Sequence, residues 1–179
     1  MRTSKSKPAD AIALLKSDHR KVDSLFTRYE KSRNRSVKAK LAHEICLELS
    51  VHTTIEEELF YPAIKMTIDP DINDEAYVEH DGAKSLIAEI LAGTPDDDFY
   101  DAKVKVLAEQ IKHHVKEEEQ RGGMFAQAKD DGDVDLVALG AAMRARKKML
   151  MAQMKNAGVP MPATRSMKGV PLEHSIPVA

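Results

Sequence analysis

Residues 52–62 read HTTIEEELFYP, and this stretch decides how the chain folds. His52 and Glu56 are four residues apart, so on a helix they lie one turn apart on the same face. Leu49 and Leu59 continue that face, which predicts that it points into a core. Because a buried imidazole or carboxylate without a partner is costly, the pair must be solvated, mutually satisfied or bound to something else.

The pattern around this stretch occurs twice in the chain. SDHRKVDSL at 17–25 resembles VEHDGAKSL at 78–86, and HTTIEEE at 52–58 resembles HVKEEEQ at 114–120. The two offsets are 61 and 62 residues. This repeat predicts two helix hairpins of the same design, each with one histidine on its first helix and a His-x-x-x-Glu pair on its second.

Apolar residues recur at spacings of three and four, and the alternation typical of strands is nearly absent. We therefore predict an all-α protein, an antiparallel up-down-up-down four-helix bundle with an additional C-terminal helix and a flexible tail. Ser36 and Thr94 are the expected N-caps of the second and fourth helices. The expected helices span about 8–31, 36–65, 70–93, 95–122 and 134–156. The corresponding division is an N-terminal extension at 1–9, the bundle at 10–128, the additional helix at 129–157 and a disordered tail at 158–179.

Composition argues against several classes of partner. Lys and Arg total 27 against 29 for Asp and Glu, so no excess of positive charge favours nucleic acid or an acidic membrane surface. Cys46 is the single cysteine, which excludes an intramolecular disulfide and a cysteine-based metal site. The polar N-terminus and the lack of a long apolar run predict a soluble, cytoplasmic protein.

Six side chains are expected to converge in one layer of the bundle, because antiparallel packing brings the middles of neighbouring helices together. They are His19, His52, Glu56, His80, His114 and Glu118. Nitrogen and oxygen donors without a thiolate suit iron, manganese or zinc, and two carboxylates can bridge a pair of ions. Six ligands leave two ions short of six-coordination, so solvent, a bridging oxygen or a small ligand must complete their shells.

The choice of ligand on the fourth helix rests on the apolar stripe. His113 and Glu117 have the same spacing as His114 and Glu118, and the repeat offset does not separate the two pairs. His114 and Glu118 continue the apolar positions, whereas His113 falls on a mostly polar face. One His-x-x-x-Glu pair is common by chance, but two in matching repeats with two further histidines indicate a site.

The stretches DHRKVDSLF, HTTIEEELFYP, EHDGAKSL and HHVKEEE resemble the hemerythrin-like HHE cation-binding domain over about residues 10–128. The resemblance implies a four-helix bundle with a non-haem di-iron centre, oxo- or hydroxo-bridged, with the six residues as ligands and both glutamates as bridges. Oxygen-carrying hemerythrins place a further histidine one turn from the third-helix ligand, where this chain has Ala76 and Lys84. The ligand set is more similar to bacterial relatives implicated in oxidative or nitrosative stress and in repair of iron centres.

Two functions of different classes follow. The first is a di-iron protein that binds or reduces a small oxidant such as dioxygen, peroxide or nitric oxide. The second is a metal-sensing or metal-stabilised interaction module without turnover, whose output is the C-terminal helix and tail. The basic, methionine-rich stretch at 143–155 suits either a helix packed on the bundle or a partner-binding segment.

Overall fold

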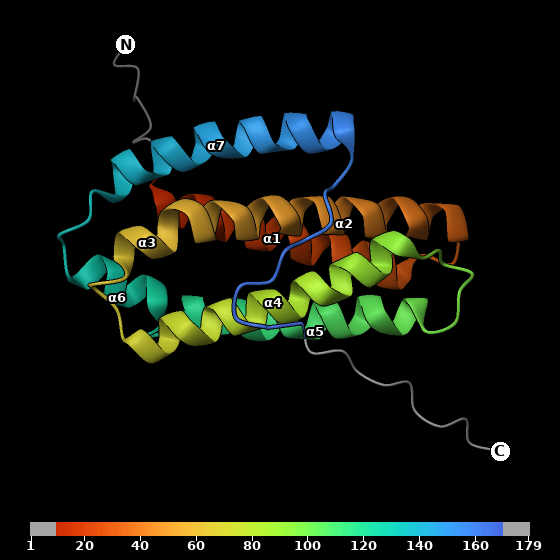
Figure 1. Ribbon diagram of the computed structural model, residues 1–179, viewed down its shortest axis with the longest axis horizontal. Coiled ribbons are helices and arrows are strands. Elements are labelled where there is room, and N and C mark those ends of the chain that lie inside the picture. The colour runs from red at the N-terminus through yellow and green to blue at the C-terminus, as the bar shows by residue number, and fades with distance from the viewer. Residues whose placement is uncertain (1–9, 170–179) are drawn as a thin grey trace, which may run out of the picture.

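The computed structural model describes residues 10–169, and every regular element within that range is helical. The elements are α1 (Ala11–Lys31), α2 (Arg35–Ile55), η1 (Glu56–Phe60), α3 (Tyr61–Ile64), α4 (Pro70–Ala92), α5 (Tyr100–Glu119), α6 (Met124–Asp130) and α7 (Leu136–Ala157). α1 and α2 form one hairpin, α4 and α5 form the other, and α7 lies on the outside of the first (Figure 1). The predicted all-α bundle with an additional C-terminal helix is confirmed.

The apolar core is divided into two clusters along the bundle. One cluster includes Leu15, Ile55 and Phe60, at the end that α6 and α7 cover. The other includes Val22, Leu49, Ile87 and Leu107. Along α1 and α4 the change from one cluster to the other falls at a buried histidine. A layer of buried polar side chains therefore lies between two apolar halves.

Helix ends differ from the sequence prediction in two places. Asn34, not Ser36, caps α2, because its side-chain oxygen accepts the N–H of Val37 at 3.1 Å. The predicted fourth helix does not begin at Thr94 and Pro95: the chain makes a turn, in which Asp97 accepts the N–H of Thr94 at 2.7 Å, and α5 begins only at Tyr100. The predicted start of the first helix at residue 8 lies outside the described residues, where α1 begins at Ala11.

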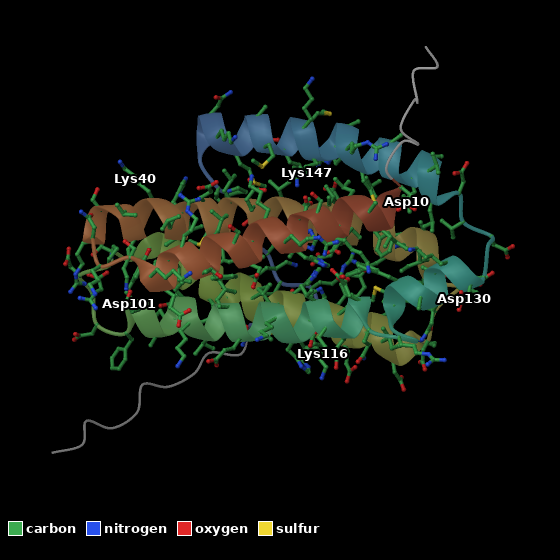
Figure 2. All side chains as sticks on the ribbon, turned by 180° about the vertical axis from the view of Figure 1, so that it is seen from behind. Asp10, Lys40, Asp101, Lys116, Asp130 and Lys147 are labelled. Carbon is green, nitrogen blue, oxygen red and sulfur yellow. The ribbon has the colours of Figure 1, made fainter. Side chains whose placement is uncertain are left out.

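α7 is held on the first hairpin by buried apolar contacts and by ion pairs. Met143, Leu150 and Met154 are buried against the bundle. Lys147 lies on the side of α7 that faces the bundle and pairs with Asp18 of α1 (Figure 2). Arg146 makes a two-pronged contact with Glu58, at 2.6 and 2.8 Å. The basic stretch at 143–155 is therefore a packed helix. No helix among residues 10–169 is both long and apolar enough to cross a membrane.

Residues 158–169, which we call the strap, leave α7 and run across the bundle to α4 (Figure 1). The backbone N–H groups of Arg165, Ser166 and Met167 donate to Oδ2 of Asp81 at 2.8, 2.5 and 3.1 Å, and the Ser166 hydroxyl donates to it at 2.7 Å. The strap has no helix or strand, as expected, but it is not loose here, since a fully buried carboxylate collects four of its donors. Residues 170–179 lie outside the described range.

Candidate metal centre

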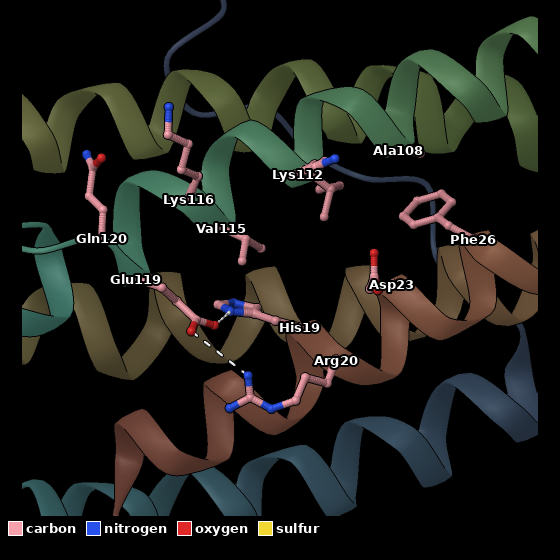
Figure 3. A pocket seen from close by; sticks show the side chains of 11 residues that line it. His19, Arg20, Asp23, Phe26, Ala108, Lys112, Val115, Lys116, Glu119 and Gln120 are labelled. Atoms are coloured by element: carbon pink, nitrogen blue, oxygen red, sulfur yellow. Dashed lines mark hydrogen bonds and ion pairs between the residues drawn. The ribbon is translucent and has the colours of Figure 1, made fainter.

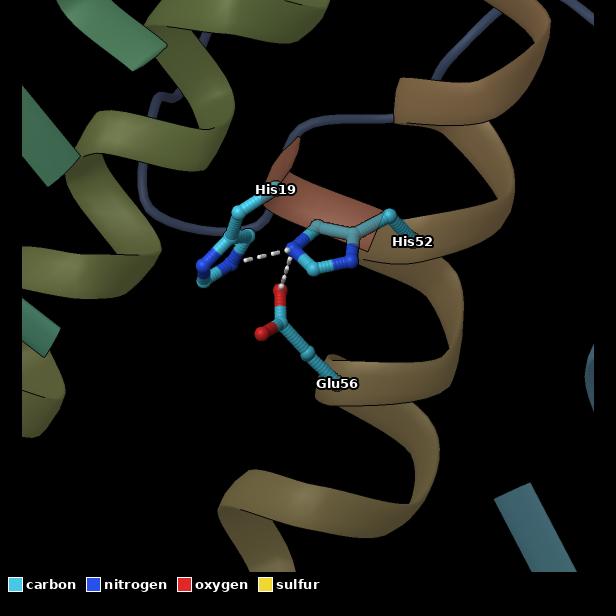
Figure 4. A group of neighbouring side chains, drawn as sticks. All are labelled: His19, His52 and Glu56. Carbon is cyan, nitrogen blue, oxygen red and sulfur yellow. Dashed lines mark hydrogen bonds and ion pairs between the residues drawn. The ribbon is translucent and has the colours of Figure 1, made fainter. Parts of the chain in front are cut away.

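Four buried histidines meet between the two hairpins. His19 of α1 and His52 of α2 face each other with their Nε2 atoms 3.2 Å apart (Figure 4). His80 of α4 and His114 of α5 do the same, also at 3.2 Å. None of the four side chains is more than a few per cent exposed. Two pairs of imidazole nitrogens are thus directed at one interior region.

Two glutamates connect the histidine pairs. Oε2 of Glu56 lies 3.2 Å from Nε2 of His52 and 3.4 Å from Nε2 of His80. Glu118 reaches across with both oxygens: Oε2 lies 3.3 Å from Nε2 of His19, and Oε1 lies 3.6 Å from Nε2 of His114. Each carboxylate therefore faces one histidine of each hairpin, which is the arrangement that two bridged cations require.

The donors form two groups with metal-ligand spacing, and Glu56 belongs to both. In the first, atoms of His19, His52 and Glu56 lie within 4.8 Å of one another; in the second, atoms of Glu56, His80 and His114 do. The structure places all six predicted side chains in this layer. His113, the alternative on α5, is exposed on the outside of the bundle.

The hydrogen bonding of the carboxylates shows whether this layer fits metal ions. Both oxygens of Glu56 and Oε2 of Glu118 are buried, and no donor among residues 10–169 makes a well-formed hydrogen bond to them. A buried acceptor without a partner costs about 1–3 kcal/mol, and more when it is charged. Cations between the histidine pairs would satisfy these oxygens, so the residues present fit a metal pair.

The pKa shifts of the two glutamates also fit a metal pair. Burial, followed by the charge of Glu118, raises the pKa of Glu56 well above its usual value. Burial alone would also raise the pKa of Glu118, but the attraction of His114 and His19 lowers it. The protein alone therefore favours one protonated and one ionised carboxylate. Two positive ions would allow both to be ionised, so metal binding should release a proton.

Each of these four buried histidines has a further carboxylate near its Nδ1 atom, on the side of the ring away from the centre. The sequence did not lead us to predict these four acids. The Nδ1–carboxylate distances are 3.6 Å for His52 and Asp18, 3.0 Å for His80 and Glu57, 2.7 Å for His114 and Glu79, and 2.7 Å for His19 and Glu119. Three of these distances allow a hydrogen bond, whereas Nδ1 of His52 and Oδ2 of Asp18 are too far apart for one. An Nδ1–H that donates to a carboxylate leaves the Nε2 lone pair free for a metal, and such contacts orient metal-binding histidines. The signal was available, since each of these acids is adjacent in sequence to a predicted ligand.

The pairing of these acids runs around the bundle. The acid on α1 faces the histidine of α2, and the acid on η1 faces the histidine of α4. The acid on α4 faces the histidine of α5, and the acid on α5 faces the histidine of α1. We call Asp18, Glu57, Glu79 and Glu119 the outer carboxylates. Three of them also meet a lysine: Asp18 pairs with Lys147, Glu57 with Lys84 and Glu119 with Lys16.

Tyr61 also reaches the centre, although it was not predicted to. Its hydroxyl lies 3.3 Å from Oε1 of Glu118 and 3.2 Å from Nε2 of His80. On a regular α-helix it would point about 140° away from Glu56. In η1, however, the N–H of Tyr61 donates to the carbonyl of Glu56, five residues back, and this wider turn brings the two onto one face.

Because of this π-helical turn, the residues that point inward after Glu56 differ from those predicted. Leu59 and Ala63 were expected to point inward, but Leu59 is only half-buried and Ala63 is exposed. Phe60 and Ile64 are buried instead. The extra residue in the π-helical turn shifts the inward positions by one, a change that a period of 3.6 residues does not anticipate.

A groove between α1 and α5 leads toward the centre. It has a volume of about 430 Å³ and is lined on one side by His19 and on the other by Val115 and Glu119 (Figure 3). Glu119 pairs there with both His19 and Arg20. His19, Ile111 and Val115 also line a much smaller inner cavity of about 10 Å³, which touches the other three histidines. These three side chains line both the groove and the inner cavity.

α6, a helix that the sequence analysis did not predict, covers His19. Phe125 stacks on the imidazole with the ring centroids 5.9 Å apart and the planes 7° from parallel. The helix begins after Gly123, where an added Cβ would lie 2.2 Å from the carbonyl oxygen of Glu117. It is seven residues long, too short for a periodic apolar pattern to reveal it.

Comparison with known proteins agrees with this geometry. The family model of the hemerythrin HHE cation binding domain matches residues 10–122. The chain belongs to this family. It is therefore a metal-cation-binding HHE domain, and the resemblance seen in the sequence is confirmed.

One solved structure and one curated relative are similar to this HHE domain. The crystal structure of a hemerythrin HHE cation binding domain-containing protein from Mycobacterium kansasii superposes with a TM-score of 0.71 at 22% identity, over 84% of this chain and 95% of that one. At that identity the likeness concerns the fold. A curated relative from Nostoc sp., named a DNA nickase, is 29% identical over 106 residues, which are 59% of this chain but 30% of that protein. The HHE domain thus matches less than a third of that relative's length.

Proposed function

We propose that this HHE domain is a non-haem di-iron protein that binds a small oxidant, such as dioxygen, peroxide or nitric oxide. The proposed ligands are His19, His52, Glu56, His80, His114 and Glu118, with the two glutamates as bridges. The observation that carries the proposal is the set of buried carboxylate oxygens without hydrogen-bond donors, which face two pairs of imidazole nitrogens.

Iron is the proposed metal, with manganese and zinc as the alternatives that the donor set accepts. Four imidazoles and two carboxylates suit all three, and the absence of thiolate disfavours soft ions. An iron pair would supply open coordination positions and electrons for reaction with a small oxidant. Tyr61, whose hydroxyl lies among the ligand atoms, would donate a hydrogen bond there.

The size of the route to the centre supports a ligand of a few atoms. The groove between α1 and α5 narrows to His19, Ile111 and Val115, and the cavity behind them has a volume of about 10 Å³. That is about the space that one water molecule needs. A role in oxidative or nitrosative stress, or in repair of iron centres, rests on similarity within the family. The near balance of 27 basic and 29 acidic residues does not favour a nucleic-acid partner.

One observation favours the second function, a metal-sensing interaction module. Glu57, the outer carboxylate of His80, pairs with Lys84, and Lys84 also pairs with Asp81, which holds the strap. On the other hairpin, Asp18 faces His52 and pairs with Lys147 of α7. Changes at the histidines would thus reach both C-terminal segments, through three side chains on the route to the strap and through Asp18 alone on the route to α7.

Metal analysis tests the first function directly. Protein reconstituted anaerobically with Fe(II) should hold two tightly bound ions in the centre, and its visible spectrum should change on exposure to dioxygen, peroxide or nitric oxide. Glu56→Ala should lose these ions, whereas Glu58→Ala should keep them, because Glu58 pairs with Arg146 on the surface. His114→Ala should abolish the spectral change, and His113→Ala should leave most of it.

Two results would overturn this proposal. A reproducible central stoichiometry of zero or one would exclude a di-iron centre. A fully loaded, reduced protein that responds to none of the three oxidants, but whose strap becomes protease-sensitive when metal is removed, would establish the sensing function instead.

A further inference from the structure

The second His-x-x-x-Glu pair of α5 lies on the outside of the bundle beside an acid of α4. Nε2 of His113 is 3.4 Å from Oε1 of Glu117, one turn along its own helix, and 3.4 Å from Oε1 of Glu79. Potential ligand atoms of these three side chains all lie within 4.8 Å of one another. The three side chains are 61, 34 and 22% exposed in the order His113, Glu117, Glu79, so water reaches the cluster.

Glu79 differs from the other three outer carboxylates in the side chains that it pairs with. Asp18, Glu57 and Glu119 each pair with a lysine as well as with a histidine Nδ1. Within residues 10–169, no lysine or arginine pairs with Glu79 or with Glu117. The place that a lysine takes at the other three positions is taken here by an imidazole and a second carboxylate.

The cluster is also preorganised. Oε2 of Glu79 is held by Nδ1 of His114 at 2.7 Å, which leaves Oε1 directed at His113. His113 and Glu117 lie one turn apart on the same face of α5, in its last two turns. Three donors from two packed helices are therefore in place without rearrangement, which lowers the cost of binding a ligand.

We propose that Glu79, His113 and Glu117 form a surface site for one divalent first-row cation, separate from the central pair. One imidazole and two carboxylates are a donor set for Zn²⁺, Mn²⁺, Fe²⁺ or Co²⁺, with water completing the shell. The cation would supply the positive charge that lysine supplies to the other outer carboxylates. Through Glu79 the surface ion and His114 would share one carboxylate.

Equilibrium dialysis of the full chain against buffered free Zn²⁺, followed by elemental analysis, tests the site. Wild-type protein should bind one ion more than His113→Ala, and Glu117→Gln should show the same loss. His43→Ala is the matched control, because His43 is exposed on α2 outside any such cluster, and it should bind as many ions as wild type. Co²⁺ should report the same ion by a visible absorption band that His113→Ala lacks.

A second variant separates this site from the central pair. Glu56→Ala should lose the central ions but keep the surface ion, so failure of the di-iron proposal leaves this test intact. The surface site is refuted if His113→Ala and wild type bind equal numbers of ions across the free-metal range. It is also refuted if the affinity for the additional ion falls less than tenfold in His113→Ala, or falls equally in His43→Ala.

Discussion

Replacing Glu56 by Gln should stabilise the metal-free protein while abolishing its stabilisation by metal. Both oxygens of Glu56 are buried without a donor, next to the second carboxylate, Glu118. One unsatisfied buried group costs about 1–3 kcal/mol, and wild type must also take up a proton at Glu56 on folding, which glutamine does not need. The substitution should therefore raise the free energy of unfolding of the apoprotein by about 1–3 kcal/mol. For a chain of this size about 1 kcal/mol corresponds to 2–4 °C, which predicts a melting temperature about 5 °C higher.

The stabilisation of the metal-free protein by Glu56→Gln should depend on pH. Because the pKa of Glu56 is raised in the folded apoprotein, the folded state binds more protons than the unfolded state above pH 4.5. The stability that this proton provides is therefore lost as pH rises through the folded pKa. The advantage of Glu56→Gln over wild type should grow from acidic to alkaline pH.

Thermal melts of metal-free and metal-loaded protein, followed by circular dichroism, measure both effects. Wild type should melt higher when loaded, and Glu56→Gln should melt at nearly the same temperature with or without metal. Glu75→Gln, an exposed acid on α4, is the control and should behave as wild type. An apoprotein of Glu56→Gln that melts at or below wild-type apoprotein would refute the argument from unsatisfied carboxylates.

Three further outcomes are expected. Glu57→Gln should weaken central metal binding about 10- to 100-fold, because it removes the charged partner of a histidine Nδ1; competition with a chelator measures the change. Asp81→Asn should speed amide hydrogen exchange at Ser166, since bonds to a charged acceptor contribute about 1.5–3 kcal/mol; unchanged protection would mean that other contacts hold the strap. Burial raises the pKa of Cys46 to about 12, so native protein should react with iodoacetamide far more slowly than unfolded protein, and equal rates would contradict the buried position.

Long periodic segments were predictable because one physical rule dominates them. The inward stripe of α4 and that of α5, from Val104 to Glu118, are buried as the spacing predicted. The errors lie where another interaction competes with periodicity. Thr94 and Pro95 have the chemistry of a helix start, but Asp97 closes a turn there and delays α5. Phe99, at a φ of 64°, precedes the helix in a left-handed conformation that no sequence rule assigns to phenylalanine.

Some residues of the candidate centre could be predicted from the sequence and others could not. The six inner residues could be found because helical spacing and the repeat place them on inward faces. The outer carboxylates could not be assigned partners, since each contacts a histidine on a different helix, as Glu119 does across to His19. Phe125 depended on a helix too short to predict. Tyr61 depended on a change of helical period, which the apolar spacing did not reveal.

That change of period has a consequence for aligning this chain with its relatives. A π-helical turn holds one residue more than the α-helical turn it replaces. Deleting one residue between 56 and 60 would make the bond from Tyr61 to Glu56 a regular four-residue one and keep the tyrosine on the face of Glu56. Regular bonding without a deletion would instead rotate the tyrosine by about 100° and carry its hydroxyl away from Glu118. An alignment with a relative that has a regular helix here should therefore place a single-residue gap between 56 and 60, so that residues facing the same way are paired.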